Sequence, residues 1–218
     1  MKEFVKKYRH IWILAYGFIY LPWFCYLEKT VKSHYHIVHV ALDDYIPFNE
    51  YFVIPYFLWF AYVAAAVIYF FFTSKEEYYR LCIYLFTGMT ISLIICTFFH
   101  NGTAFRPQLD PNKNIFTAMV VKLYETDTCT NVFPSIHVYN SICTYIAIRK
   151  SQKLRQYRWI QGGAFVLTLL ICLATVFLKQ HSVIDGVGAA IMAYALYSVV
   201  YGYSDLRAEK KVREKVLG

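Results

Sequence analysis

Six long apolar stretches constrain the fold of this sequence more than any other feature. A helix needs about 20 apolar residues to cross the hydrocarbon core of a bilayer, and these stretches approach or exceed that length. Membrane-spanning strands are shorter and alternate polar with apolar residues, whereas residues 63–71 read VAAAVIYFF without alternation. The sequence therefore predicts an all-α integral membrane bundle of six transmembrane helices in a single membrane domain, residues 1–218. The predicted spans are residues 11–27, 51–74, 81–105, 132–148, 159–178 and 181–204.

The composition and the charge distribution agree with a membrane protein. Hydrophobic residues make up 58% of the chain and charged residues 17%, against about 25% charged residues in soluble domains. The net charge of +8 would suggest nucleic acid in a soluble protein, but 16 of the 22 Lys and Arg residues lie at the termini and in the loops on one side. The positive-inside rule places that side, with both termini, in the cytoplasm. We therefore expect the lipid bilayer as partner and no nucleic acid.

The N-terminal 21 residues have the basic start and apolar run of a signal peptide. They lack a small-residue cleavage site, and their removal would leave an odd number of spans, so we interpret them as part of the first span. With this topology, the segments around 28–50 and 106–133 and the turn at 179–182 face outward.

Three ionisable side chains near the outward ends of the spans are candidates for catalysis, because charge at this depth is expensive. They are His137, His181 and Asp185. His181 and Asp185 are four residues apart and so share one helix face within hydrogen-bonding reach. A carboxylate that accepts from one imidazole nitrogen leaves the other free as a base or nucleophile. The alternative is a structural pair, in which Asp185 only stabilises a helix start.

The sequence FPSIH at 133–137 begins the fourth span. Proline suits the first turn of a helix, and Ser135 can offer both its hydroxyl and its amide to an anion. His137 projects from the same turn. The segment is therefore either an ordinary helix start or a set of oriented donors that binds phosphate.

Arg106, followed by Pro107, is the only arginine among the six basic residues predicted to face outward. A guanidinium can bind two phosphate oxygens at once. An isolated exposed arginine is more often a solvated charge, so the functional interpretation depends on Arg106 sharing one membrane face with the histidines.

The order Arg-Pro, Pro-Ser-x-His and His-x-x-x-Asp resembles the type 2 phosphatidic acid phosphatase superfamily of membrane lipid phosphatases and phosphotransferases. The resemblance covers the third to the sixth span. It implies that His181 attacks phosphorus, that Asp185 orients it and that His137 protonates the leaving oxygen, while Ser135 and Arg106 hold phosphate oxygens. The implied reaction is hydrolysis of a phosphomonoester or pyrophosphate lipid through a phosphohistidine, with no metal and no cofactor.

The sequence departs from the pattern of this superfamily at three positions. The first motif of the superfamily begins with a lysine, where this chain has Phe99, and the third begins with Ser-Arg, where it has Ala174 and Thr175. Lys179 or His100 is a candidate for supplying a missing charge.

These departures resemble the branch that contains inositol phosphorylceramide synthase and sphingomyelin synthase, so a head-group phosphotransferase is the alternative function. The third motif also looks like that of bacterial phosphatases, which implies a bacterial plasma membrane, and the charge pattern places the candidate site on the extracytoplasmic face of that membrane.

Two further functions would use the same residues. A transporter of lipid phosphates needs a phosphate site but releases no product. A haem protein could use His137 and His181 as axial ligands, but that leaves Ser135, Arg106 and Asp185 without a common task.

The outward segment around 28–50 contains other polar features. His34, His36 and His39 suggest either a metal site or an exposed interfacial segment. Asp43 and the residues after it predict a short interfacial helix that Pro47 breaks, placed where it can form a wall of the substrate entrance. Three of the six cysteines lie near the outer face, where a disulfide can form, but the sequence selects no pair. They are Cys25, Cys96 and Cys129.

Overall fold

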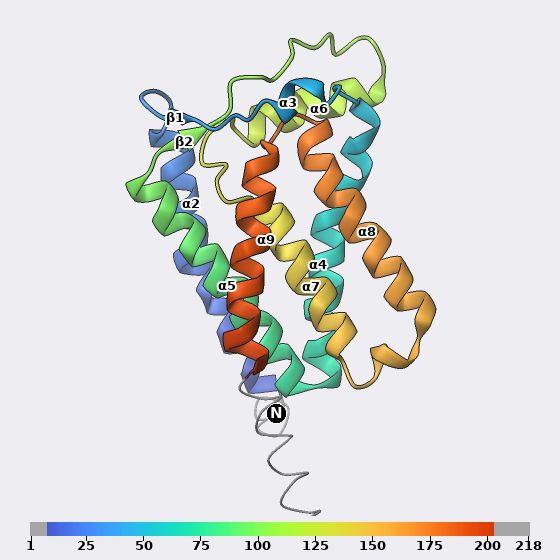
Figure 1. The fold of residues 1–218 in the computed structure, drawn as a ribbon. Coiled ribbons are helices and arrows are strands. Elements are labelled where there is room, and N and C mark those ends of the chain that lie inside the picture. The colour runs from blue at the N-terminus through green and yellow to red at the C-terminus, as the bar shows by residue number, and fades with distance from the viewer. Residues whose placement is uncertain (1–7, 203–218) are drawn as a thin grey trace, which may run out of the picture.

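A computed structural model describes residues 8–202 and shows a bundle of helices with two short strands at one end (Figure 1). The strands β1 and β2 pair in parallel, with His36 opposite Asn101 and Ile37 opposite Gly102. The elements in chain order are η1 (Arg9–Tyr16), α2 (Gly17–Thr30), β1 (His36–Ile37), α3 (Leu42–Tyr45), η2 (Glu50–Phe52), α4 (Val53–Thr73), α5 (Lys75–Phe98), β2 (Asn101–Gly102), α6 (Ile115–Thr126), α7 (Ile136–Lys150), η3 (Leu154–Gln156), α8 (Arg158–Phe177), α9 (Val183–Tyr197) and η4 (Ser198–Gly202).

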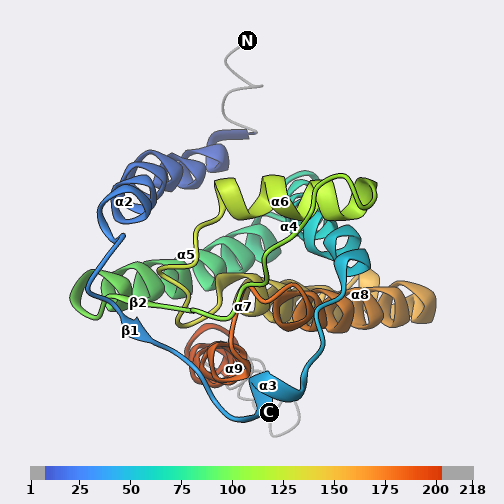
Figure 2. The same ribbon diagram turned by 90° about the horizontal axis from the view of Figure 1, so that it is seen from above.

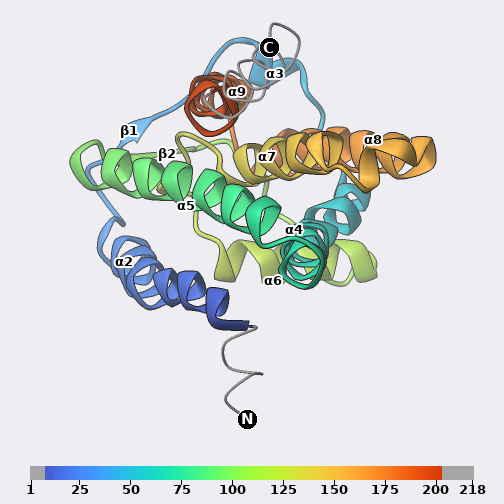
Figure 3. The ribbon, with the colours of Figure 1, turned by 90° about the horizontal axis from the view of Figure 1, so that it is seen from below.

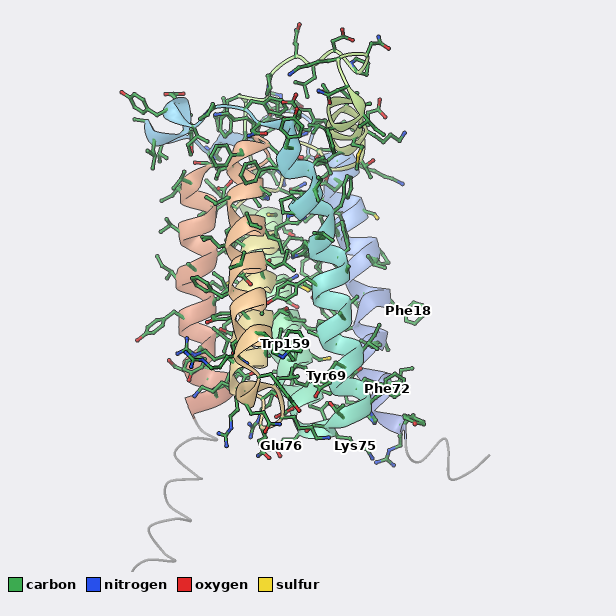
Figure 4. The ribbon with its side chains drawn as sticks, turned by 90° about the vertical axis from the view of Figure 1, so that its right-hand side faces the viewer. Phe18, Tyr69, Phe72, Lys75, Glu76 and Trp159 are labelled. Atoms are coloured by element: carbon green, nitrogen blue, oxygen red, sulfur yellow. The ribbon has the colours of Figure 1, made fainter. Side chains whose placement is uncertain are left out.

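Among the described residues, five helical segments are long and apolar enough to cross a membrane. Large apolar side chains cover the outside of the bundle: Phe18 is 85% exposed and Trp159 is 76% exposed. Phe18 and Phe72 project outward in Figure 4, whereas the charged Lys75 and Glu76 lie at one end of the bundle. An apolar circumference with charges at the end is the surface that a bilayer requires. The five segments are Arg9–Thr30, Glu50–Thr73, Lys75–Phe98, Arg158–Phe177 and Val183–Gly202.

The predicted fourth span is the short central helix α7. It is 15 residues long, so it falls below the length that crosses a hydrocarbon core unaided, and the count of six spans stays a prediction. Helix α7 contacts α4, α5, α8 and α9 and lies between its neighbours when the bundle is viewed from below (Figure 3). Its small polar side chains Ser141 and Thr144 are buried, so α7 is an internal helix.

Four predicted span boundaries differ from the helix ends in the structure, and serine caps set three of them. The third helix starts at Lys75 rather than 81, because the Ser74 side chain accepts from the Glu77 amide, and it ends at Phe98, so residues 99–105 are not helical. The fourth helix starts at Ile136 rather than 132 because Ser135 is its N-cap. The sixth starts at Val183 rather than 181 because Ser182 is its N-cap.

The outward segment 106–133, interpreted from sequence as a loop, contains helix α6. Asn114 caps its start by accepting from the Thr117 amide, and Thr117, Val120 and Leu123 are buried at helical spacing. The short helix expected before Pro47 is present as α3.

The start of η1 and the end of η4 lie at the same end of the bundle, and α3, α6 and both strands lie at the opposite end (Figure 1). This arrangement agrees with an even number of crossings. Which end faces the cytoplasm stays a prediction.

Candidate active site

His181, in the turn before α9, contacts Asp185 in the first turn of α9, so the predicted pair forms although the two residues do not share a helix face. His181 Nδ1 lies 3.3 Å from Asp185 Oδ2, and the two side chains are 8% and 0% exposed. Asp185 Oδ2 also accepts from the Ser182 amide at 3.0 Å, which completes a capping box at the start of α9. Asp185 therefore does both things that its position predicted: it caps the helix and it holds one nitrogen of His181. No residue within 8–202 bonds the second nitrogen, Nε2.

The turn before His181 is tight and aims the imidazole inward. The amides of Gln180 and His181 both donate to the Thr175 carbonyl at 3.0 Å, and Lys179 adopts a left-handed φ of 55°. The backbone of the turn is thus fixed on the last turn of α8.

His137, on the first turn of α7, faces this pair. Its ring centroid lies 5.8 Å from that of His181. Tyr56 and Trp59 of α4 pack against the other sides of the ring at 4.6 and 4.4 Å, and His137 Nδ1 is buried without a partner among the described residues. Two histidines, one from α7 and one from the turn between α8 and α9, are therefore buried next to each other.

Ser135, in the Pro-Ser-x-His motif, is hydrogen-bonded to Asp185, in the His-x-x-x-Asp motif. Its amide donates to the Asp185 carbonyl at 3.2 Å, and its hydroxyl oxygen accepts from the Val138 amide at 3.4 Å. The expectation that Ser135 offers both amide and hydroxyl to phosphate is therefore wrong for the amide, because the protein already uses it. The hydroxyl proton is still free to donate.

Arg106 reaches the same region from the loop after β2. Its Nη2 donates to the Thr128 carbonyl at 2.6 Å and to the Gln180 side-chain oxygen, and its guanidinium lies 4.5 Å from the ring of Tyr124. Arg106 Nε is buried and has no partner among the described residues. Burial raises the pKa of Tyr124 to about 12, so this ring faces Arg106 as a neutral phenol that donates to the Leu178 carbonyl.

The Lys179 ammonium contacts the α3 segment. It donates to the carbonyls of Asp43 and Ile46 at 2.8 and 2.5 Å, and it lies 5.6 Å from the centre of the Phe105 ring. A role of Lys179 in holding phosphate stays a prediction.

Sequence reasoning missed the polar groups that connect Arg106 to His137. The Gln180 amide nitrogen donates to Asp127 Oδ2 at 3.5 Å, and the Tyr56 hydroxyl donates to the same oxygen at 2.5 Å. Tyr56 in turn packs on His137. Gln180 directly precedes the candidate nucleophile, and this position in the sequence could have identified it as a site residue. Asp127 lies in a segment interpreted as loop and carried no signal.

The three positions that depart from the family pattern carry no cation. The Phe99 ring stacks on His36 at 4.6 Å, and Ala174 is fully buried. The Thr175 hydroxyl donates to the Cys172 carbonyl of its own helix at 2.8 Å.

The remaining polar candidates of the outward segment lie in separate contacts. His36 stacks on Phe99, and His39 pairs with Asp44 at 2.9 Å. Within residues 8–202, no three His, Cys, Asp or Glu side chains are grouped to hold a metal ion. All six cysteines, which lie in this range, are free thiols.

Comparison with known proteins identifies the family. The family model described as PAP2 superfamily matches residues 79–208, which is more than half of the chain and includes every predicted site residue. No curated protein and no solved structure matches the chain. The chain belongs to the PAP2 superfamily.

Proposed function

We propose that this protein hydrolyses a phosphomonoester or pyrophosphate lipid through a phosphohistidine intermediate. One observation carries the proposal: the buried pair of His181 and Asp185 faces a second histidine, His137, with 5.8 Å between the ring centroids. Membership of the PAP2 superfamily supports phosphatase or phosphotransferase chemistry on phosphate esters, and the apolar helices support an enzyme in a bilayer.

In the first step, Nε2 of neutral His181 attacks phosphorus. Asp185 accepts from Nδ1–H, which fixes the tautomer with its lone pair on Nε2. As the phosphorus–oxygen bond to the lipid breaks, His137 as imidazolium gives its proton to the departing oxygen. Arg106 and the Ser135 hydroxyl hold the other phosphate oxygens, on which negative charge accumulates.

In the second step, His137, now neutral, takes a proton from water as the water oxygen attacks phosphorus. The phosphorus–nitrogen bond to His181 breaks and inorganic phosphate leaves. Both steps use the same residues in reversed proton roles. Because Arg106 supplies the positive charge, we propose that the reaction needs no metal.

The location of the reaction follows from the charge pattern. The site lies at the end of the bundle that carries α3 and α6, and the excess of basic residues lies in the termini and in the loops predicted at the other end. We therefore propose that the reaction takes place at the extracytoplasmic face. The resemblance of the third motif to that of bacterial phosphatases supports a bacterial plasma membrane as its location.

A head-group phosphotransferase is the second candidate, because Phe99, Ala174 and Thr175 carry no charge where the superfamily has cations in two of the three positions. In that reaction a lipid or polyol hydroxyl replaces water in the second step. The residues and their roles are unchanged.

One experiment separates these functions. Protein purified in detergent is incubated with phosphatidic acid, phosphatidylglycerol phosphate, polyprenyl pyrophosphate and sphingolipid phosphates, with and without an acceptor lipid, and a His181→Ala preparation serves as the control. Release of phosphate supports the phosphatase, and a new phosphodiester lipid supports the transferase. Movement of an intact lipid phosphate across vesicles without any product would show a transporter and contradict an enzyme.

A further inference from the structure

An acidic residue outside the family match contacts the residues that directly follow the candidate nucleophile. The chain between β1 and η2 crosses the end of the bundle and brings α3 beside the start of α9, as the view from above shows (Figure 2). Asp43 lies on α3, yet it is only 3% exposed, because its carboxylate is directed into the bundle end. The residues that the family model matches begin at 79, so this contact is not a part of the shared motifs.

Both carboxylate oxygens of Asp43 accept hydrogen bonds, and two of the three donors directly follow His181 in the sequence. The Ser182 hydroxyl donates to Oδ2 at 2.5 Å, and the Val183 amide donates to Oδ1 at 2.9 Å. The Val40 amide of the same segment also donates to Oδ2, at 2.9 Å. Hydrogen bonds to an ionised acceptor are among the stronger ones in proteins, and these join two distant segments of the chain.

Lys179 makes a second contact between the turn and the α3 segment, and we call the contacts of Asp43 and Lys179 together the clamp. The Lys179 ammonium donates to the carbonyls of Asp43 and Ile46. His181 thus lies between two residues, Lys179 and Ser182, that are both fastened to the α3 segment.

Helix capping accounts for only part of the contact with Asp43. The capping box of Ser182 and Asp185 does not include the Val183 amide, and Asp43 Oδ1 accepts from that amide as a cap does. The bond from the Ser182 hydroxyl to Asp43 Oδ2 is not one that helix capping requires. Burying another carboxylate beside Asp185 is unfavourable unless every oxygen is paired, and the donors from Ser182 and Val183 provide that pairing. The arrangement therefore fixes the loop that carries His181 more firmly than helix formation requires.

We propose that Asp43 is a positioning residue of the active site, which holds Ser182 and so sets the direction of the His181 imidazole. The proposal rests on the proposed function, in which His181 is the nucleophile. Displacement of a reacting group by about 1 Å can lower a rate by 10²-fold. We expect Asp43→Asn, which places an N–H where Ser182 and Val40 now donate, to lower kcat by about 10- to 100-fold. KM should change little, because Arg106 and Ser135 do not contact Asp43.

The experiment compares Asp43→Asn and Asp43→Ala with the matched control Asp44→Asn. Asp44 is the next residue on α3, its side chain is 65% exposed and its contact is with His39, so the control should keep the wild-type kcat. The measurements are steady-state kinetics on the best lipid phosphate, the rate of phosphohistidine formation in a rapid quench, and thermal unfolding. A slower phosphohistidine step at unchanged KM supports positioning. Wild-type kinetics in Asp43→Asn would overturn the proposal.

Two additions keep the result decisive. If the Asp43 variants do not fold, Ser182→Ala and Lys179→Gln each remove part of the clamp, and unchanged phosphohistidine formation in both would overturn the proposal. If the wild-type protein turns over none of the lipids, the proposed function fails, and hydrogen exchange over residues 179–186 then tests the clamp by itself. Faster exchange in Asp43→Asn than in Asp44→Asn supports the clamp, and equal exchange refutes it.

Discussion

The close contact between α5 and α7 at Gly88 makes a sharp prediction about stability. A Cβ atom at this position would overlap Cζ and Cε1 of the Tyr139 ring and lie 2.5 Å from its hydroxyl oxygen, about 1 Å inside ordinary contact distance. Tyr139 cannot move easily, because it is fully buried and its hydroxyl donates to the Tyr84 carbonyl at 2.6 Å. The substitution Gly88→Ala must therefore separate the two helices or break that hydrogen bond.

The magnitude follows from these two alternatives. Overpacking a filled core costs about 1–3 kcal/mol, and loss of a buried hydrogen bond adds about 1–2 kcal/mol. When both costs apply, we expect Gly88→Ala to lower the free energy of unfolding by about 2–5 kcal/mol, which corresponds to a fall in Tm of roughly 4–20 °C for a chain of this length. Activity should fall too, because Tyr139 is two residues from His137 on the same helix.

The assay is thermal unfolding in detergent, with Gly163→Ala as the matched control. Gly163 is also a helical glycine, on α8, but a Cβ there would meet no atom within 4 Å. The control should be neutral or slightly stabilising, because alanine favours a helix over glycine by about 1 kcal/mol. Equal Tm values for the two variants would refute the packing argument. A loss in both variants would show a general sensitivity of the helices to alanine.

Three further predictions concern the proposed reaction. His181→Ala should abolish turnover and also the acid-labile phosphoenzyme seen with radiolabelled substrate; labelled protein in this variant would exclude His181 as the nucleophile. Asp185→Asn, which keeps the side-chain volume, should lower kcat by about 10²–10⁴-fold by loss of the correct imidazole tautomer, and a wild-type rate would contradict that role. Activity should survive a strong chelator; full inhibition that added divalent ions reverse would argue against the metal-independent mechanism.

The apolar pattern and the motif spacing were informative where the interaction is local. A spacing of four residues brought His181 and Asp185 together, and the shared membrane face brought His137 to them. The contact between His181 and Asp185 is local in the sequence, although His181 lies in the turn before α9 and not on the helix. The predicted boundaries of the third, fourth and sixth spans differ from the helix ends because apolar residues continue past the end of α5, whereas serine caps set the starts of α5, α7 and α9.

Most of the contacts that sequence reasoning missed depend on the path of loops. Lys179 was a candidate for phosphate, but its ammonium donates to carbonyls of the α3 segment. Asp43 and Asp127 reach the site from segments more than 50 residues away. No periodicity reports such contacts, because loop paths are set by tertiary packing.

The charge balance of the site bears on the choice between phosphatase and transferase. Among the described side chains that connect to the two histidines, Arg106 is the cation, while Asp127 and Asp185 are both acidic. Arg106 already donates from Nη2 to Thr128 and Gln180. It can therefore attract a substrate phosphate by its charge and donate to it from Nε, which has no partner among the described residues. A phosphomonoester brings up to two negative charges and a phosphodiester brings one. An uncompensated second charge in a low-dielectric site is costly. The proposed hydrolysis of a monoester therefore requires a proton on one of the monoester oxygens or on His137 when the substrate binds, whereas the alternative transferase, acting on a singly charged diester, would not require it.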